Sequence, residues 1–473
     1  MGGIFGVCSK DECVTDLFFG TDYHSHLGTR RGGMAVYDGE NFHRAIHSIE
    51  NSPFRLKFES ELTKMKGYAG IGCISDSESQ PLIFHSKIGT FAVVTVGRIN
   101  NKKQLIEQLI SSNNAYFSEL SGDGRINDTE ITASLISRSD NIADGIAYAQ
   151  SMIEGSMTLL VCVDGLIYAA RDRLGRTPLS VGKKENGYCV SFESFAYFNL
   201  GYKAHHELGP GELVAVTADK ITTIIKPGAK MRMCSFLWTY FGYPTSSYEN
   251  VNVEEMRYRC GCSLADQDKA DGPKAEVDYV AGVPDSGTAH AIGYANCSGI
   301  PFARPLIKYT PTWPRSFTPE EQKIRKLIAR MKLVPINVLI ENKRLLFIED
   351  SIVRGTQMHG TVEFLHACGV KELHVRPACP PILYYCKYLN FARSASENEL
   401  ISHQAINALE NDNGKNHCAD YAVYGSKPYK NMVDIIRRNL NLTTLEYHSL
   451  DGLLGAIGID KCKLCTYCWT GNE

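Results

Sequence analysis

The chain has 473 residues and a mass of 52.5 kDa, which is enough for two domains with full-sized cores. Its formal net charge of −2 and pI near 6.7 give no general attraction to nucleic acid or to a membrane surface. No apolar run approaches the about 18 residues of a membrane span, and the N-terminal residues lack a signal-peptide pattern. We therefore expect a cytoplasmic protein whose partners include neither nucleic acid nor a membrane.

The first half of the chain predicts a layered α/β domain. Short apolar runs rich in β-branched residues, such as 91–96 and 159–163, are separated by Gly, Asn and Asp, which is typical of strands. Helix-like apolar spacing lies between them, over 103–111 and 128–136. Further along, the polar stretch 265–275 is rich in Asp, Lys and Gly, and we expect it to be a surface excursion.

Two segments of the second half predict a strand, a loop of small residues and a helix: 280–295 and 344–357. In the second segment, Glu349 and Asp350 end the apolar run, and a loop of small residues follows. Exposed backbone N–H groups over 351–356 would cradle a monophosphate at the positive end of the next helix. The two acids would then stand beside ribose hydroxyls or a hydrated Mg²⁺. The alternative to such a site is a strand that ends in two acids and is followed by an ordinary polar turn. The acid pair taken alone, without the rest of the segment 344–357, would favour that alternative.

Sixteen cysteines in a chain expected to be intracellular favour metal binding over disulfides. Cys462, Cys465 and Cys468 are separated by two-residue gaps, and they supply enough thiols for two or three ligands of one centre. These residues allow three interpretations: a zinc ion on four cysteines, an iron–sulfur cluster, or buried thiols without a metal.

The order and spacing of these motifs resemble the amidophosphoribosyltransferase family, whose members convert phosphoribosylpyrophosphate (PRPP) into 5-phosphoribosylamine at the first step of purine synthesis. The resemblance implies a type I phosphoribosyltransferase domain with a Rossmann-like parallel sheet over 231–473. It assigns a pyrophosphate loop to Asp285, Ser286 and Gly287, a phosphate loop to Ser351, Arg354, Gly355 and Thr356, Mg²⁺ to Ser286, Glu349 and Asp350, and catalytic roles to Glu349, Asp350, Lys308 and Arg315.

Within the family, the chain resembles the iron–sulfur subgroup. That likeness implies a [4Fe–4S] cluster whose ligands are Cys234, Cys386, Cys465 and Cys468, with Zn²⁺ as the alternative. It also implies a lid over PRPP that begins at Lys308, although the string 308–317 is one residue longer than usual and contains two prolines.

The first 230 residues resemble the class II glutamine amidotransferase domain, an N-terminal-nucleophile fold with four α/β/β/α layers. The likeness is carried by Gly3-Ile4-Phe5-Gly6, Arg31-Gly32, Gly70-Ile71-Gly72, Asn127-Asp128-Thr129-Glu130 and the string 171–179.

The glutaminase residues of that domain are mostly replaced. The family's nucleophilic cysteine falls on Gly2, its carboxylate-binding arginine on Ser75, and its oxyanion-hole asparagine on Val96, which Gly97 follows. Only Asp128 remains, at the position that holds the substrate amine. We therefore expect no glutaminase activity from residues 1–230.

The sequence thus predicts an amidophosphoribosyltransferase-type enzyme, a glycosyltransferase that uses ammonia, either free or passed from a separate glutaminase. A PRPP-binding regulator or scaffold is one alternative, and a transferase for another amine acceptor is the second. The resemblance also implies a homo-oligomer and inhibition by purine nucleotides.

Overall fold

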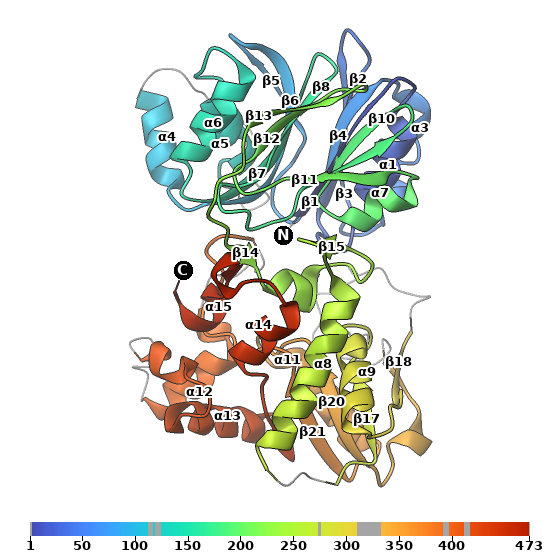
Figure 1. Ribbon diagram of the computed structural model, residues 1–473, viewed down its shortest axis with the longest axis vertical. Helices are drawn as coiled ribbons and strands as arrows, with labels where there is room; N and C mark the ends of the chain where they lie inside the picture. Colours follow the sequence, from blue (N-terminus) through green and yellow to red (C-terminus); the bar gives the residue numbers. More distant parts are fainter. Residues whose placement is uncertain are drawn as a thin grey trace.

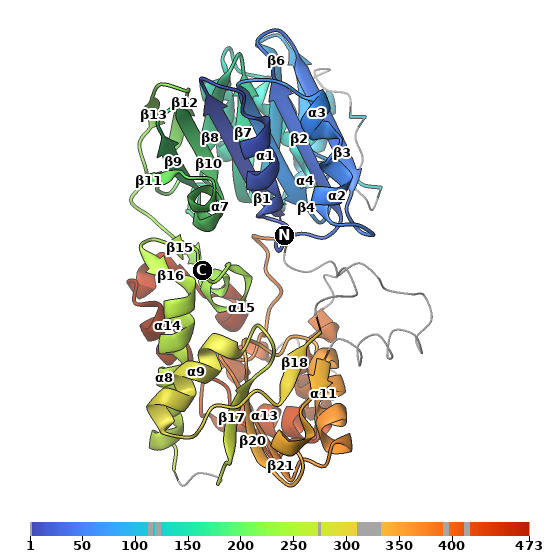
Figure 2. The same ribbon diagram turned by 90° about the vertical axis from the view of Figure 1, so that its right-hand side faces the viewer.

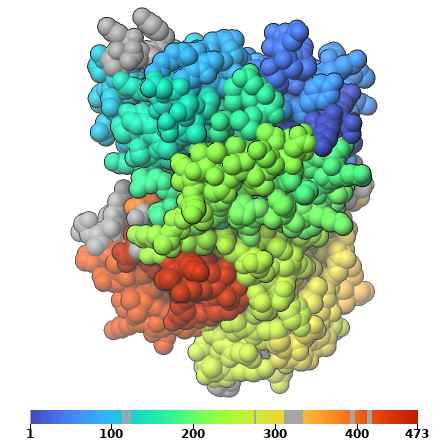
Figure 3. Space-filling view, turned by 45° about the horizontal axis from the view of Figure 1, so that its top comes forward, coloured from blue at the N-terminus to red at the C-terminus, as the bar shows by residue number. Residues whose placement is uncertain are grey.

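The computed structural model describes residues 2–111, 117–118, 124–272, 276–309, 333–390, 397–410 and 417–472. They form two lobes stacked along the long axis of the molecule, and both ends of the chain lie close to the junction (Figures 1 and 2). In the space-filling view, the C-terminal segment, in red, packs beside the light green chain that joins the lobes (Figure 3). The expected domain boundary at residue 230 falls between β13 (Ile221–Ile225) and β14 (Met233–Cys234), and it remains a prediction.

The N-terminal lobe consists of two antiparallel sheets packed face to face, with helices on both outer faces (Figure 1). One sheet has the strand order β11-β9-β10-β1-β4-β2-β3 and the other β13-β12-β8-β7-β6-β5. The strands are β1 (Gly2–Ser9), β2 (Arg31–Tyr37), β3 (Phe42–Ser48), β4 (Ala69–Ser75), β5 (Leu82–Ser86), β6 (Gly89–Ile99), β7 (Gly155–Val163), β8 (Leu166–Ala170), β9 (Ser180–Lys184), β10 (Gly187–Ser191), β11 (Lys203–Glu207) and β12 (Leu213–Val216), besides β13. The helices are α1 (Val14–Asp22), α2 (Phe54–Phe58), α3 (Glu61–Lys64), α4 (Lys102–Ser111), α5 (Asp128–Ile136), α6 (Ile142–Met152) and α7 (Ser194–Asn199).

Side-chain alternation along the strands explains the four layers. Ile4 of β1 points between the sheets, where it joins the same core as Leu160 of β7. Phe5 points to the opposite face and packs in the cluster that includes Leu17 of α1. On the far side, Val161 of β7 packs in a third cluster with residues of α5 and α6. The predicted α/β/β/α arrangement is therefore confirmed.

The C-terminal lobe is built on a parallel sheet with the order β17-β20-β21-β22. Val280 and Leu346 face α8 and α9, while Ala281 and Leu345 face α11, α12 and α13, so each face of the sheet is covered by helices. The predicted Rossmann-like sheet is confirmed. These elements are β17 (Tyr279–Gly282), β20 (Arg344–Glu349), β21 (Glu372–Pro377), β22 (Thr444–Leu445), α8 (Val253–Ala270), α9 (Thr288–Ser298), α11 (Thr356–Ala367), α12 (Ile401–Leu409) and α13 (Lys427–Asn439).

Short elements complete this lobe and join it to the first. They are the strand pairs β14 with β23 (Leu464–Cys465), β15 (Ser247–Tyr248) with β16 (Val251–Asn252) and β18 (Leu306–Lys308) with β19 (Leu333–Pro335), the helices α14 (Leu450–Ile457) and α15 (Tyr467–Thr470), a π-helix over Leu237–Phe241, and 3₁₀ turns over Asn337–Leu339, Glu397–Glu399, Cys418–Ala422 and Lys461–Lys463. Within the described part of the chain, no helix has both the length and the apolar character needed to cross a lipid bilayer.

The expectation of a surface excursion over 265–275 is wrong for its first part, because α8 continues to Ala270. The polar residue that misled the prediction, Asp268, is buried and forms an ion pair with Arg376, with 2.9 Å between Oδ2 and Nε. Its Oδ2 also accepts a hydrogen bond from the Tyr294 hydroxyl at 2.6 Å. A polar side chain with such partners is compatible with a packed helix.

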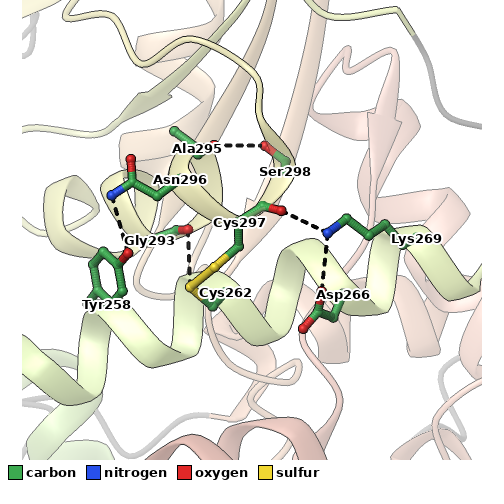
Figure 4. Close-up of a disulfide and its surroundings, with 9 residues drawn as sticks. All are labelled: Tyr258, Cys262, Asp266, Lys269, Gly293, Ala295, Asn296, Cys297 and Ser298. Atoms are coloured by element: carbon green, nitrogen blue, oxygen red, sulfur yellow. Dashed lines mark hydrogen bonds and ion pairs between the residues drawn. A yellow bond between two sulfur atoms is a disulfide. The ribbon is translucent and has the colours of Figure 1, made fainter.

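A disulfide joins α8 to α9, between Cys262 and Cys297 (Figure 4). Their Cα atoms are 5.2 Å apart, which is within the usual range for a disulfide. The expectation that the cysteines serve metal binding rather than disulfides is therefore wrong for this pair. Nearby, the Lys269 ammonium of α8 donates to the carbonyl of Cys297 at 2.7 Å, which is a second link between the two helices. Lys269 also pairs with Asp266 of its own helix.

Two glycines allow α8 and α9 to pack this closely. A Cβ atom at Gly261 would lie 1.9 Å from the carbonyl oxygen of His290, and one at Gly293 would lie 2.0 Å from that of Tyr258. Since both obstacles are backbone atoms, the two helices would have to move apart to admit a side chain.

Gly293→Ala is therefore predicted to destabilise the protein by about 1–3 kcal/mol, the usual cost of overpacking. The matched control is Gly360→Ala in α11, where an added Cβ atom meets nothing within 4 Å. That variant should gain up to about 1 kcal/mol, because alanine favours the helix over the unfolded chain. Calorimetry of both variants checks the pair, and equal shifts in Tm would contradict the close-packing account.

Candidate functional site

Two buried carboxyl groups stand at the end of β20. Glu349 accepts a hydrogen bond from the Ser286 hydroxyl at 2.7 Å, and Asp350 accepts one from the Ser351 hydroxyl at 2.5 Å. Burial raises the pKa of Glu349 well above its usual value, and the neighbouring charge of Asp350 raises it further. Burial also raises the pKa of Asp350, to about 6. The pair therefore favours a cation that would stabilise both ionised forms.

The loop 283–287 lies beside this acid pair, because β17 and β20 are adjacent parallel strands whose carboxyl ends share one edge of the sheet. The N–H group of Val283 donates to the carbonyl oxygen of Ile348 at 3.0 Å. A Cβ atom at Gly287 would lie 2.0 Å from the same oxygen, so this position requires glycine. The peptide bond between Pro284 and Asp285 is cis.

The loop 351–356 forms the N-terminal end of α11. Gly355 has φ +75°, and a Cβ atom there would lie 2.4 Å from Cδ1 of Ile401, so glycine suits both the conformation and the space. The backbone N–H groups of this loop make no hydrogen bond to another described residue. Free N–H groups at the positive end of a helix are the usual features of a phosphate site. Thr356 is the first residue of α11.

The candidate cations around these loops are held by exposed acids. The Lys308 ammonium lies 3.0 Å from Oδ2 of Asp285, and Nη2 of Arg354 lies 2.9 Å from Oε2 of Glu399. Exposed pairs of this kind contribute about 1 kcal/mol or less, so a bound phosphate could replace either acid. Arg315, the other predicted cation, lies outside the described residues.

A cavity lies at the edge of the N-terminal lobe, next to the junction of the lobes. The structure brings together all five predicted remnant residues there, and two residues of the other lobe complete the wall. The cavity is partly open to solvent, and its volume of about 20 Å³ is enough for at least one water molecule. The wall comprises Gly2, Ser75, Ser77, Glu78, Gln80, Thr95, Val96, Gly97 and Asp128 with Leu389 and Asn390.

Two of the replaced positions are built into the local backbone. Gly2 pairs with Ser75 across β1 and β4, and a Cβ atom at Gly2 would lie 2.6 Å from the carbonyl oxygen of Ile74. The hydroxyl of Ser75 accepts the N–H groups of Ser77 at 3.2 Å and of Glu78 at 2.9 Å. Ser75 therefore closes a turn instead of reaching into the cavity with a positive charge.

Asp128, the family's amine-binding residue in this cavity, already has a cationic partner. The Lys102 ammonium lies 2.7 Å from Oδ1 of Asp128, and it also donates to the carbonyl oxygen of Ile126. Glu78 is buried and accepts the backbone N–H of Asp128 at 3.3 Å. Sequence analysis missed both Lys102 and Glu78, because neither lies in a string that matches the family.

Four of the cysteines meet at the junction of the lobes. The parallel pairing of β14 with β23 sets Cys234 opposite Cys465. Burial raises the pKa of Cys468 well above its usual value, and electrostatic interaction with Cys234, Cys386 and Cys465 raises it further, so the four predicted ligands lie in one region of the junction. Cys462, in contrast, is exposed.

The cofactor of these thiols stays a prediction. Among the described residues, no three His, Cys, Asp or Glu side chains are grouped as ligands of a metal ion. Around one zinc ion the sulfur atoms would lie about 4 Å apart, given Zn–S bonds of about 2.3 Å in a tetrahedron. The four thiols are thus neighbours without being arranged for a single ion.

Comparison with known proteins settles the family. Residues 70–196 match the family model of a glutamine amidotransferase domain. The amidophosphoribosyltransferase of Bacillus subtilis (strain 168) is 29% identical over 99% of this chain and 93% of its own length. That of Mycobacterium bovis is 30% identical over 99% of this chain and 85% of its own length. The chain belongs to the amidophosphoribosyltransferase family.

Amidophosphoribosyltransferases are glycosyltransferase-type enzymes of the first step of purine biosynthesis. The solved structure of glutamine PRPP amidotransferase from B. subtilis, complexed with ADP and GMP, superposes with a TM-score of 0.83. It is 29% identical, and the superposition covers 100% of this chain and 97% of that one. The predicted family and the two-part fold are both confirmed.

Proposed function

We propose that the chain forms 5-phosphoribosylamine and pyrophosphate from PRPP with ammonia as the nitrogen donor, and that its glutaminase cavity is inactive. The observation that carries the proposal is the ion pair between Lys102 and Asp128. It places a cation where the family would hold the amine of glutamine, while the loops around Glu349 keep free N–H donors and paired acids.

The loops of the C-terminal lobe suit the two charged ends of PRPP. The N–H groups of 351–356 would bind the 5′-phosphate, and the loop 285–287 would hold the pyrophosphate. Lys308 would then leave its ion pair with Asp285 and pair with the departing pyrophosphate. The C1–O bond breaks through a cation-like ribose, so neutralising the departing pyrophosphate lowers the barrier.

Magnesium fits the acid pair. Ser286, Glu349 and Asp350 offer only oxygen ligands, which Mg²⁺ prefers, and both buried acids are stabilised in their ionised form by a cation. When bound, Mg²⁺ would supply positive charge next to the pyrophosphate and the ribose oxygens.

The N-terminal cavity opposes each contact that glutamine needs. The substrate amine would meet Lys102, and Gly2 offers no thiol. The substrate carboxylate would find Ser75 in place of an arginine, with Glu78 in the same wall. Losing an oxyanion donor alone usually costs about 10²–10³ in kcat, and here the nucleophile is absent as well. Ammonia needs none of these groups, because it is itself the nucleophile.

We further propose that the four thiols at the junction hold a [4Fe–4S] cluster, with zinc as the alternative. Each cysteine of a cubane binds a different iron, which allows more distance between the sulfur atoms than one zinc ion does. The surrounding side chains are largely apolar and include Phe236 and Trp469, whose ring centroids are 6.1 Å apart. Such a shell suits a cluster that joins distant parts of the chain.

The B. subtilis relative was solved with ADP and GMP bound. This supports purine nucleotides as inhibitors of the present chain, in line with an enzyme at the start of their synthesis. Pyrophosphate release with and without these nucleotides would measure the effect.

The proposed function is tested by pyrophosphate release from PRPP and Mg²⁺ with anaerobically purified protein. Ammonium chloride at raised pH, where more of it is free base, should support release, whereas glutamine at neutral pH should not. Release with glutamine would overturn the inactive cavity. Release with neither, although PRPP binds, would point to a regulator or to another amine acceptor.

A Gly2→Cys variant serves as a second arm of this assay. It should not recover glutamine-dependent release, because the new Cβ atom would lie 2.6 Å from the Ile74 carbonyl and both Ser75 and Lys102 remain. Recovery in this single variant would mean that the cavity is still a working glutaminase apart from its nucleophile.

The acid pair also predicts a pH dependence of Mg²⁺-PRPP binding. Because the pKa of Asp350 is raised to about 6, this carboxyl is neutral below that pH and its share of the binding is lost as the pH falls. Affinity should be about tenfold weaker at pH 5 than at pH 7.5, measured by calorimetry. The phosphates of PRPP also titrate, at about pH 6, and they add a pH dependence of their own. Asp350→Asn should keep only the dependence that comes from these phosphates, and equal dependence in both proteins would contradict the assignment.

A further inference from the structure

Arg176 belongs to the N-terminal lobe but touches three segments that carry the proposed cluster ligands. Its Nη1 donates to the sulfur of Cys465 at 3.3 Å. Its backbone carbonyl accepts the N–H of Cys234 at 3.1 Å. Its guanidinium lies over the ring of Tyr388, two residues after Cys386, at 3.4 Å from the ring centroid. One buried side chain therefore connects the cysteine sites to the other lobe.

The loop between β8 and β9 fixes this arginine in place. The backbone N–H of Arg176 donates to Oδ2 of Asp172 at 2.5 Å, and the Asp172 carboxylate also accepts the N–H of Leu174 at 3.0 Å. The next residue, Thr177, shares a hydrogen bond of 2.8 Å with Thr158 of β7. The backbone at Arg176 is thus held by its own strand connection, which presents the side chain toward Cys465 and Tyr388.

The electrostatic surroundings of Arg176 suit a negatively charged group at Cys465. A buried guanidinium is costly unless anionic or electron-rich groups face it. The Tyr388 ring supplies one such face, the Asp172 carboxylate of the same loop interacts with the guanidinium electrostatically, and the sulfur of Cys465 lies at another face. A cluster bound through four thiolates would bring the anionic charge that a neutral thiol lacks.

A neighbouring strand of the N-terminal lobe holds the same region. At the end of β6, Nη1 of Arg98 donates to the carbonyl of Cys386 at 3.1 Å, and the side chain of Asn100 donates to that of Lys387 at 2.8 Å. In return, the Asn390 amide donates to the carbonyl of Gly97 at 3.0 Å. The N-terminal lobe therefore forms three hydrogen bonds with the segment that contains Cys386.

We propose that Arg176 is a positioning residue of the iron–sulfur cluster, which it holds through Cys465 and whose reduction potential it raises. The inference rests on the proposed cluster. Hydrogen bonds to ligand sulfurs and nearby positive charge stabilise the reduced, more negative cluster, so both raise the potential. It also gives the N-terminal lobe a role that requires no glutaminase activity.

The test compares Arg176→Gln with the wild-type protein, purified anaerobically as the full chain. The readouts are iron content, absorbance near 400 nm, the EPR spectrum and the midpoint potential for one-electron reduction by dithionite. Arg176→Gln should lower the equilibrium constant for reduction about tenfold, a fall of about 59 mV, and should bleach several-fold faster in air. Arg173→Gln is the matched control, since this arginine lies in the same loop but is exposed, and it should behave as wild type.

Two more variants guard against a simple folding defect. Arg176→Lys keeps a positive charge near Tyr388 but loses the rigid donor to sulfur, so its potential should fall by less than that of Arg176→Gln. Tyr388→Phe keeps the ring beneath the guanidinium and should leave the potential unchanged.

Three results would overturn the inference. An unchanged potential and EPR spectrum in both Arg176 variants would refute the role of Arg176 but not the cluster. Equal shifts in Arg176→Gln and Arg173→Gln would show a nonspecific charge effect. Wild-type protein without iron would refute the cluster itself, and the role of Arg176 would fall with it.

Discussion

The parallel pairing of β14 with β23 is the contact on which the arrangement of the molecule depends. It sets Cys234 beside Cys465, and the hydroxyl of Ser235 donates to the carbonyl of Cys465 at 3.0 Å. A few residues further on, the carbonyl of Cys468 accepts the N–H groups of Leu383 at 2.9 Å and Tyr384 at 3.0 Å. The end of the chain is thus tied both to the segment between the lobes and to the chain that follows β21.

The segment tied down by this contact connects the acid pair with the N-terminal cavity. The chain after β21 begins at Ala378, whose N–H donates to the carbonyl of Glu349 at 2.8 Å. It reaches the wall of the N-terminal cavity at Leu389 and Asn390. The same segment therefore adjoins the acid pair, the four thiols and the remnant of the glutaminase site. The N-terminal lobe has a structural role in this arrangement whether or not it hydrolyses glutamine, because Arg98 and Asn100 bind this segment.

The fold was predictable where local pattern decides it. Apolar runs and small-residue loops located β17, β20 and the helices after them, since strand, loop and helix are contiguous in the sequence. The disulfide between Cys262 and Cys297 was not predictable, because it depends on how closely two helices cross. The pairing of Lys102 with Asp128 and the contact of Arg176 with Cys465 were missed for a similar reason. Each joins residues whose proximity is set by tertiary packing, and the last spans 289 positions of the chain.

The central claim is that the N-terminal cavity does not bind glutamine, whereas the C-terminal lobe still binds PRPP. The most direct test is calorimetric titration of the full chain, first with Mg²⁺-PRPP and then, once it is saturated, with glutamine. We predict heat when Mg²⁺-PRPP is titrated into the free protein and none when glutamine is then added, because Lys102 already neutralises Asp128. Saturable glutamine binding that disappears in Asp128→Asn would contradict it.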